Sequence, residues 1–392
     1  MKRALTKAVV FKVVAFIVLL TLLAASCHFW TVDRKGVLRA IYPISGFLAS
    51  RTIECSSTSP SWQRELMSVG LWTLRAPASQ SAFVDSKGKL HHCESGWTGE
   101  VFRSPQVTKD SKFQYGSLTK PLTSAMVIKL IIDGRLDSES NLIDLFGLDE
   151  PPESGNRFDV LTVGNLMAYR SGVLGEIFMD GVTPWCPYSI EQLVRQQTWM
   201  AEDGAHRYSN LNYCILGEVV SKIGGKNYRD IANNMLDLDS YGIGFVNSPK
   251  SEEWVVPDYR FHDFYRDDVQ PSFDYFAISA TAGMGGSASA YASLMYNILE
   301  GYLKSDFGSE NESCDAKNIR SCYGYLFYKY SPWLNSAINV KEGYMPGYSS
   351  VVVVNDQGEV FVWLGNSDTP NAKAGESMEK FLNILAQSFS QP

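Results

Sequence analysis

Apolar residues recur at helical spacing in two parts of the chain, and a short polar motif precedes each part. In the first stretch, residues 121–134, one face collects Leu122, Ala125, Met126, Leu130 and Ile131. Gly134 stands where a helix C-cap is expected. Residues 211–220 repeat the amphipathic pattern behind the polar motif Tyr208-Ser209-Asn210. The pattern therefore predicts two helices, each beginning at a polar motif.

Two runs of β-branched and aromatic residues near the C-terminus predict a hairpin. They cover residues 344–354 and 359–364 and flank a turn at residues 355–358. Residues 81–84 and 99–102 are predicted as early strands, and the middle of the chain as mostly helical. Residues 375–385 form an amphipathic helix pattern, so this tail is expected to pack on the sheet.

The first helix opens with Ser117-Leu118-Thr119-Lys120. A helix start offers free backbone N–H groups and a positive dipole end, which favour a developing oxyanion. Lys120 lies one turn away on the same face, and burial would leave it as a neutral amine close to the Ser117 hydroxyl. Alone, the motif also fits a serine N-cap and a solvated lysine. Ser86-Lys87-Gly88-Lys89 has the same spacing, but its glycine favours a hairpin turn.

The second motif places Tyr208 in the loop just before a helix, free to point into a cleft. A tyrosine held between two lysines can have a depressed pKa, so Tyr208 could pass protons between Ser117 and a leaving group. The Asn210 amide could hold Lys120 and a substrate carbonyl together. Alone, the motif also fits a surface tyrosine and a helix-capping asparagine.

The third motif, Lys341-Glu342-Gly343, precedes the predicted hairpin. Lys341 is expected on or beside the strand that borders the cleft, where its charge could stabilise an ionised Tyr208 or attract an anionic substrate. The backbone N–H groups of Tyr344 and Ser117 are the candidate oxyanion hole.

Together, these motifs resemble those of the serine β-lactamase-related family, which includes class C β-lactamases, D-alanyl-D-alanine carboxypeptidases and related esterases and peptidases. The resemblance runs from about residue 70 to the C-terminus. Residues 161–172 resemble the family's I-T-x-x-x-L-L-x-H-x-S-G segment, 208–217 its Y-S-N-x-x-Y-x-x-L-G segment, and 281–288 its A-G-G-x-x-S-T segment.

The resemblance implies an α+β fold, in which helices flank an antiparallel sheet and an all-helical lobe is inserted into it. The implied organisation is a signal peptide over residues 1–26, an N-terminal spacer over 27–65 and a hydrolase domain over 66–392. Ser117 would lie at the seam between the lobes.

The implied activity is that of a serine hydrolase that forms an acyl-enzyme on Ser117 with amide or ester substrates. Lys120 and Tyr208 would be catalytic, and the substrate-binding residues would be Asn210, Lys341, Gly343 and Tyr344. The expected partner is a small-molecule or peptide-like acyl substrate, with no cofactor. A true β-lactamase, a penicillin-binding carboxypeptidase and a non-catalytic envelope binding protein are the alternatives.

Two departures from the family pattern bear on the substrate. Glu342 replaces the threonine of K-T-G, and its carboxylate would repel a penicillin or a D-Ala-D-Ala terminus by roughly a few kcal/mol at about 4 Å. Alternatively, Glu342 points away, because neighbouring strand residues alternate faces. Tyr169 replaces the histidine of L-L-x-H, which is interpreted as a packing difference.

The N-terminus has the character of a targeting segment. Four basic residues, Lys2, Arg3, Lys7 and Lys12, precede the apolar run 13–25. The run is shorter than the about 20 residues of a membrane span, which favours a signal peptide. Small residues before Cys27 also resemble a lipobox, and an uncleaved anchor is the third option. Each places the enzyme in the bacterial cell envelope outside the cytoplasmic membrane. The lipobox or the anchor would in addition attach it to the membrane, through Cys27 or through the apolar segment.

Composition and cysteines agree with an exported globular enzyme. The 392 residues are 45% hydrophobic, and the net charge of −7 argues against nucleic acid as the main partner. Six cysteines remain besides Cys27, and the expected disulfides are Cys55–Cys93, Cys186–Cys214 and Cys314–Cys322. The sequence has no histidine cluster of the metal-binding type, so no metal site is predicted.

An aromatic-rich stretch between residues 254 and 276 has two interpretations. It contains Trp254, Tyr259, Phe261, His262, Phe264, Tyr265, Phe273, Tyr275 and Phe276, with Asp263, Asp267 and Asp268. It could form a wall over an acyl pocket, or it could be ordinary loop packing.

Overall fold

A computed structural model of the chain places these elements in space. It describes residues 2–149, 159–175, 186, 190, 206–248, 253–258, 260, 274–303, 324–332, 337–367 and 376–389. Cys314, Cys322, the three aspartates and most aromatic residues of the 254–276 stretch lie outside these ranges, so the predictions about them stay predictions.

The centre of the molecule is a seven-stranded antiparallel sheet with the order β1-β3-β2-β10-β9-β8-β7. Its strands are β1 (Glu54–Cys55), β2 (Ser79–Val84), β3 (Leu90–Ser95), β7 (Tyr328–Tyr330), β8 (Ile338–Met345), β9 (Tyr348–Asn355) and β10 (Val360–Gly365). The predicted hairpin is confirmed as β9 and β10, in which Val354 lies opposite Val360.

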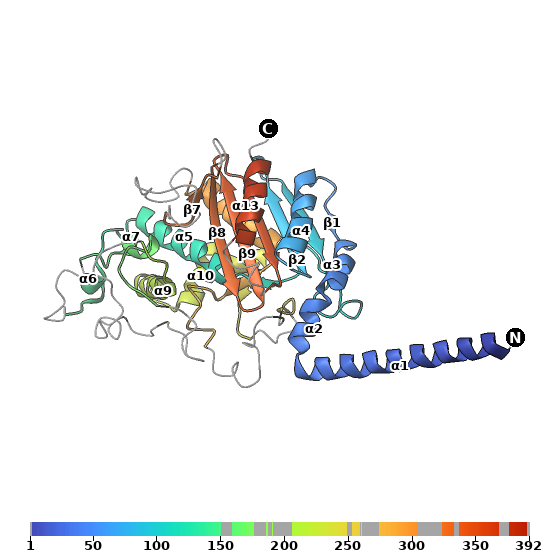
Figure 1. Cartoon of the computed structure of the whole chain (residues 1–392). Coiled ribbons are helices and arrows are strands. Elements are labelled where there is room, and N and C mark those ends of the chain that lie inside the picture. Colours follow the sequence, from blue (N-terminus) through green and yellow to red (C-terminus); the bar gives the residue numbers. More distant parts are fainter. Residues whose placement is uncertain are drawn as a thin grey trace.

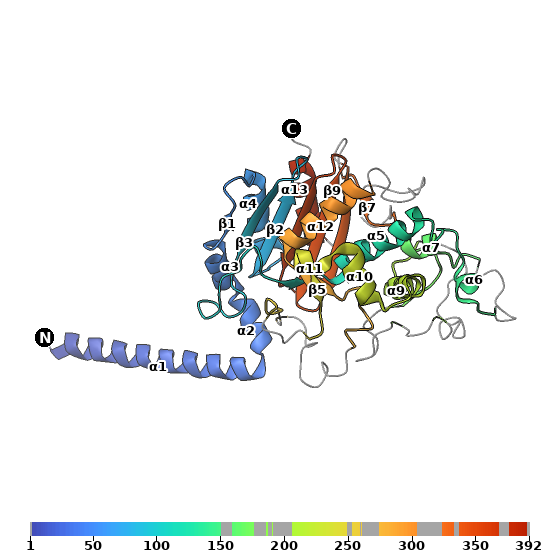
Figure 2. The ribbon, with the colours of Figure 1, turned by 180° about the vertical axis from the view of Figure 1, so that it is seen from behind.

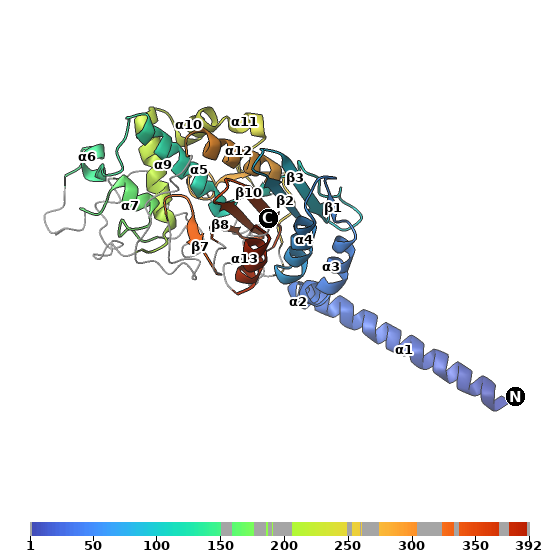
Figure 3. The same ribbon diagram turned by 90° about the horizontal axis from the view of Figure 1, so that it is seen from above.

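Helices cover both faces of this sheet, as seen from above in Figure 3. α4 (Ser61–Thr73) and α13 (Glu376–Phe389) lie on one face, and α12 (Ala288–Gly301) lies on the other. Met378, Phe381 and Leu382 of α13 are fully or almost fully buried beside Trp363 of β10, so the predicted packing of the tail helix on the sheet is confirmed.

Between β3 and β7 the chain builds a mainly helical lobe beside the β8 edge (Figures 1 and 2). Its helices include α5 (Thr119–Ile132), α6 (Leu142–Phe146), α7 (Val163–Met167), α9 (Asn210–Gly224), α10 (Tyr228–Leu236) and α11 (Leu238–Tyr241). A small sheet joins the lobe to the rest, formed by β4 (Phe113–Gln114), β5 (Gly244–Phe245) and β6 (Met284–Gly286) in the order β4-β6-β5. The expected α+β architecture is confirmed.

One predicted strand is wrong. Residues 99–102 lie in a bend and turn, where the Arg103 and Ser104 N–H groups donate to the Glu100 carbonyl and Phe102 has φ 62°. The partner of β2 is instead β3, and Cys93 lies opposite Ser81. The polar sequence of β3 lacks the β-branched residues that signal a strand, so pairing and burial rather than propensity define it.

Two predicted disulfides are confirmed. Cys55–Cys93 joins β1 to β3, and Cys186–Cys214 joins residue 186 to α9. Cys27 has a free thiol and is exposed.

The N-terminal segment forms a helix that extends beyond the predicted apolar run 13–25 at both ends. α1 (Lys2–Val32) contains one stretch, Phe11–Val32, of 22 residues with a mean hydropathy of 2.2, which is long and apolar enough to cross a membrane. A signal sequence has the same properties.

Residues 34–65, which lie within the predicted spacer, contain two short helices, α2 (Arg34–Ala40) and α3 (Tyr42–Ser50), followed by β1 and the start of α4. Tyr42 and Ala49 of α3 are buried, and Cys55 of β1 pairs with β3. This segment therefore packs on the domain that contains the main sheet.

Candidate active site

The Ser117 side chain lies at the junction of three elements. A 3₁₀ turn (η1, Gly116–Leu118) leads from β4 into α5, so Ser117 precedes the first turn of the helix, close to the predicted position. Ser86, the serine of the other S-x-x-K motif, lies in the exposed turn between β2 and β3, where Gly88 has φ 77°. Only the first motif is therefore built into the interior.

Ser117 Oγ makes two contacts expected from the sequence. Lys120 Nζ lies 2.9 Å from it, and Tyr208 Oη lies 2.8 Å from it on the other side. Ser117 and Tyr208 are half-buried, whereas the Lys120 side chain has no exposed surface. Ser117 and Tyr208 thus keep part of their surface exposed, whereas Lys120 behind them is fully buried.

Neutral oxygen atoms surround the Lys120 amine. Nζ donates to Asn210 Oδ1 at 2.8 Å and to the Thr281 carbonyl at 2.9 Å, besides its contact with Ser117. An ammonium fills these positions with its three N–H donors. A neutral amine keeps two donors for Asn210 and Thr281 and directs its lone pair at the Ser117 hydroxyl. The geometry accommodates both protonation states, and only the Ser117 hydrogen bond reverses direction.

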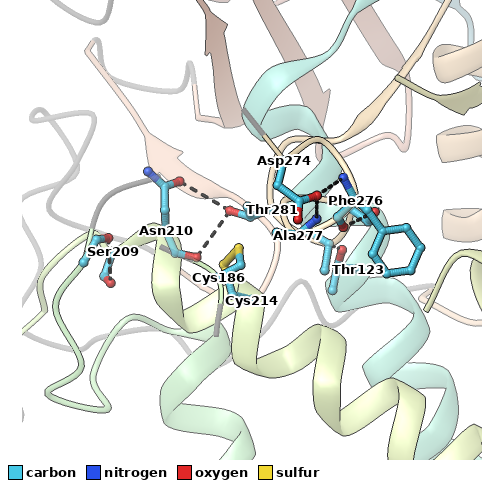
Figure 4. Close-up of a disulfide and its surroundings, with 12 residues drawn as sticks. Thr123, Cys186, Ser209, Asn210, Cys214, Asp274, Phe276, Ala277 and Thr281 are labelled. Carbon is cyan, nitrogen blue, oxygen red and sulfur yellow. Dashed lines mark hydrogen bonds between the residues drawn. A yellow bond between two sulfur atoms is a disulfide. The ribbon is translucent and has the colours of Figure 1, made fainter. Parts of the chain in front are cut away.

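Asn210 is the first residue of α9 and is held from two sides. The Thr281 hydroxyl donates to its carbonyl at 3.3 Å and lies 3.4 Å from its Oδ1, as Figure 4 shows. The Cys186–Cys214 disulfide lies beside this pair (Figure 4) and ties residue 186 to the same helix. These contacts orient the amide that receives Lys120.

Tyr208 lies between two lysines, as its motif predicts. Lys341 Nζ is 4.7 Å from the centre of the Tyr208 ring, and Lys120 Nζ is 5.4 Å from it. Lys341 is only 1% exposed, and the rings of Tyr169 and Tyr328 lie 5.5 and 5.0 Å from its Nζ. Both lysine amines thus lie close to one phenol ring in a buried, low-dielectric environment.

Two residues beside Tyr208 had no specific signal in the sequence. Tyr169, the residue in place of the family histidine, has φ 57° and packs against Tyr208 with 4.8 Å between ring centres. Burial, with the positive charges of Arg170 and Lys341, lowers the pKa of His206 to about 4. His206 is therefore neutral at pH 7, 6.0 Å from the Tyr169 ring centre.

Two glycines allow β8 to lie close to η1, the turn that carries Ser117. A Cβ on Gly343 would lie 2.3 Å from the Tyr115 carbonyl oxygen, and one on Gly116 (φ 54°) would lie 2.8 Å from the Tyr344 nitrogen. Ser350 Oγ donates to the same Tyr115 carbonyl at 2.7 Å. The backbone of Tyr344 is thereby placed against the turn that carries Ser117.

Replacing Gly343 with alanine is expected to push β8 away from η1, because the new methyl group has no space. We expect the free energy of unfolding to fall by about 1–3 kcal/mol. The hydrolysis rate should also fall, because β8 borders the turn that carries Ser117. Thermal melting and ester hydrolysis measure the two effects. Gly301→Ala is the control, since nothing lies within 4 Å of a Cβ there. A variant as active and stable as the parent would contradict the close packing.

The alternation of faces along β8 separates Lys341 from Glu342. Lys341 lies opposite Val352, whereas Glu342 lies opposite Val351 on the face that carries α4 and α13. This is the second of the two arrangements considered for Glu342, in which its carboxylate and the Lys341 ammonium occupy opposite faces.

Comparisons with known proteins place this fold and site in a family. The Beta-lactamase family model matches residues 81–379. The chain belongs to the Beta-lactamase family. The range includes the Ser117, Tyr208 and Lys341 motifs and all strands of the main sheet except β1 and the first residues of β2.

The chain is similar to proteins with different names. A protein of Dichelobacter nodosus, provisionally named fimbrial assembly protein FimD of serogroup D, is 29% identical over 359 residues, which cover 90% of each chain. The D-amino acid amidase of Ochrobactrum anthropi SV3 has a TM-score of 0.65 at 17% identity and covers 83% of this chain and 100% of its own. A class C β-lactamase of Rhodobacter sphaeroides has a TM-score of 0.65 at 14% identity and covers 84% and 99%. The two structures show a shared fold.

Proposed function

We propose that this protein is an exported serine hydrolase that forms an acyl-enzyme on Ser117 with amide or ester substrates, of the D-amino-acid or peptide type. The observation that carries the proposal is the contact of the Ser117 hydroxyl with both Lys120 and Tyr208, at 2.9 and 2.8 Å. A hydroxyl needs such a neighbouring base to attack a carbonyl.

In the first half of the reaction, Ser117 Oγ attacks the carbonyl carbon as its proton passes to Lys120 Nζ. The N–H groups of Ser117 and Tyr344 would stabilise the oxyanion. Tyr208 then delivers a proton to the leaving amine or alcohol, and the C–N or C–O bond breaks. The Lys341 charge near the ring helps Tyr208 to exchange protons, because it stabilises the phenolate form.

In the second half, water attacks the acyl carbon and gives one proton to the Tyr208 phenolate. The bond between Ser117 Oγ and the acyl carbon breaks, and Ser117 takes back the proton held by Lys120. Asn210 keeps the Lys120 amine aimed at Ser117 throughout, since its Oδ1 accepts from Nζ at 2.8 Å. The acid is released and the enzyme returns to its starting state.

The disulfides and the apolar α1 support export, because structural disulfides persist in oxidising compartments. The proposed location is the cell envelope, outside the cytoplasmic membrane. Attachment to the membrane would come from α1 or from lipid on Cys27.

The substrate class is tested by steady-state kinetics on a p-nitrophenyl ester, D- and L-phenylalanine amide, and a penicillin. We expect turnover of the ester and preference for the D-amide by at least about tenfold, which is about 1.4 kcal/mol in the transition state. Faster turnover of the penicillin than of either amide or the ester would instead favour a β-lactamase. Slow turnover of the penicillin with a long-lived adduct would favour a penicillin-binding carboxypeptidase.

A non-catalytic role in envelope assembly is the second candidate, favoured by the similarity to the Dichelobacter nodosus protein over 90% of both chains. Such a binding protein would keep the cleft without turnover of any substrate in this panel. The intact contacts of Ser117 support the hydrolase over this alternative.

A further inference from the structure

The segment directly after α1 presents an apolar face away from the protein. On α3, Tyr42, Gly46 and Ala49 are buried, whereas Ile44 and Phe47 are 64% and 50% exposed. Ile41, at the helix start, is 42% exposed and continues the i, i+3 spacing of this stripe. The stripe is the part of the helix that does not pack on the domain.

Basic and aromatic residues border the stripe. Residues 33–51 contain the cations Arg34, Lys35, Arg39 and Arg51 and the single anion Asp33, a net charge of +3 in a chain of net charge −7. The Arg51 guanidinium lies 4.9 Å over the Phe47 ring. Trp72 of α4 packs beside Gly46 and is 45% exposed. Apolar and aromatic side chains with basic neighbours are typical of segments in the membrane interface.

The domain holds this segment firmly. The Tyr42 hydroxyl donates to the Leu71 carbonyl, and the Arg260 guanidinium lies 4.2 Å over the Tyr42 ring. Arg39 donates to the Arg260 carbonyl at 3.0 Å, and Arg260 forms a buried ion pair with Asp258 at 2.7 Å. Buried contacts of Tyr42 thus hold α3 on the domain, and a part-buried hydrogen bond of Arg39 links α2 to Arg260.

We infer that the exposed residues Ile41, Ile44, Phe47 and Trp72, with their basic neighbours, form a surface that seats the hydrolase domain on a lipid bilayer. The occupant follows from chain continuity, because α2 begins two residues after the apolar stretch Phe11–Val32. If processing leaves a lipid on Cys27 instead, six residues separate it from α2, a reach of at most about 20 Å. In either form the surface lies next to the bilayer.

Docking on this surface would orient the active site. α3 lies beside β1 at one edge of the sheet, on the side from which α1 leaves, whereas β8 lies near the opposite edge (Figures 1 and 3). Five strand spacings of about 4.8 Å separate β1 from β8, so about 24 Å of sheet lies between the lipid and the site. The site would then face substrates in the aqueous layer.

The experiment uses the full chain reconstituted into phosphatidylcholine–phosphatidylglycerol vesicles that contain brominated phosphatidylcholine. Ile44→Cys and Phe47→Cys are each introduced into a Cys27→Ser protein and labelled with an environment-sensitive fluorophore. The Cys27→Ser protein without an introduced cysteine, treated with the same fluorophore, measures nonspecific labelling. Ile132→Cys is the matched control, since Ile132 is 55% exposed at the end of α5. This helix belongs to the helical lobe, away from α3 and β1 (Figure 1).

We expect brominated lipid to quench the labels at positions 44 and 47 by at least about twofold and to leave the label at 132 unchanged. Equal, weak quenching at all three positions would overturn the inference. Labels at 44 and 47 that are shielded from aqueous iodide but not quenched by lipid would also overturn it, because a second copy of the chain would then cover the face. Neither outcome affects the hydrolase proposal.

Discussion

Replacing Ser117 with alanine is expected to lower ester or amide hydrolysis by about 10⁴–10⁶-fold and to leave the fold intact. The variant loses the attacking oxygen that contacts Lys120 and Tyr208, so the proposed acyl-enzyme on residue 117 cannot form. Since the side chain is small and half-buried, the melting temperature should change little. Hydrolysis of a p-nitrophenyl ester, corrected for the uncatalysed rate, measures the effect.

The chain supplies a matched control in its second S-x-x-K motif. Ser86→Ala removes the same hydroxyl from an exposed turn between β2 and β3, so it should retain the parental rate. A Ser117→Ala variant as active as the Ser86→Ala variant would remove Ser117 from the mechanism and with it the proposed function.

Replacing Lys120 with methionine should lower the rate constant for acylation by about 10²–10⁴-fold. Methionine fills a similar volume but cannot accept the Ser117 proton. It also leaves the Thr281 carbonyl and Asn210 Oδ1 without the donor that they share. Because these buried acceptors lose a donor, we also expect a loss of about 1–3 kcal/mol of stability, which thermal melting measures separately from the rate.

Lys129→Met is the control for charge on the same helix, since Lys129 is partly exposed and pairs with Asp133 at the end of α5. Stopped-flow acylation by an activated ester separates this step from deacylation. If Lys120→Met acylates at the parental rate, Lys120 only positions its neighbours, and Tyr208 would have to act as the base.

The local parts of the site could be predicted because helix geometry fixes them. Ser117 and Lys120 are three residues apart at a helix start, and Asn210 begins α9 two residues after Tyr208, so each pair follows from sequence spacing alone. The alternation of faces along β8 likewise follows from the period of a strand. That the three motifs form one site is predicted from the family resemblance.

The remaining contacts depend on tertiary packing. The Thr281 carbonyl that accepts a hydrogen bond from Lys120 belongs to the backbone, so no residue type in the sequence predicts this contact. The rings of Tyr169 and Tyr328 reach Lys341 from α7's C-terminal loop and from β7, segments about 160 residues apart. A spacer is predicted over residues 27–65 because they match no segment of the family, whereas Tyr42 and Ala49 of α3 are buried in the structure.

The most direct test of the central claim is the intact mass of the protein after separate incubation with a fluorophosphonate and with a penicillin. Parent, Ser117→Ala and Ser86→Ala proteins are compared. We predict one fluorophosphonate adduct on the parent and on Ser86→Ala, and none on Ser117→Ala. A parent protein that gains no adduct from either reagent would contradict the account and favour a non-catalytic binding protein.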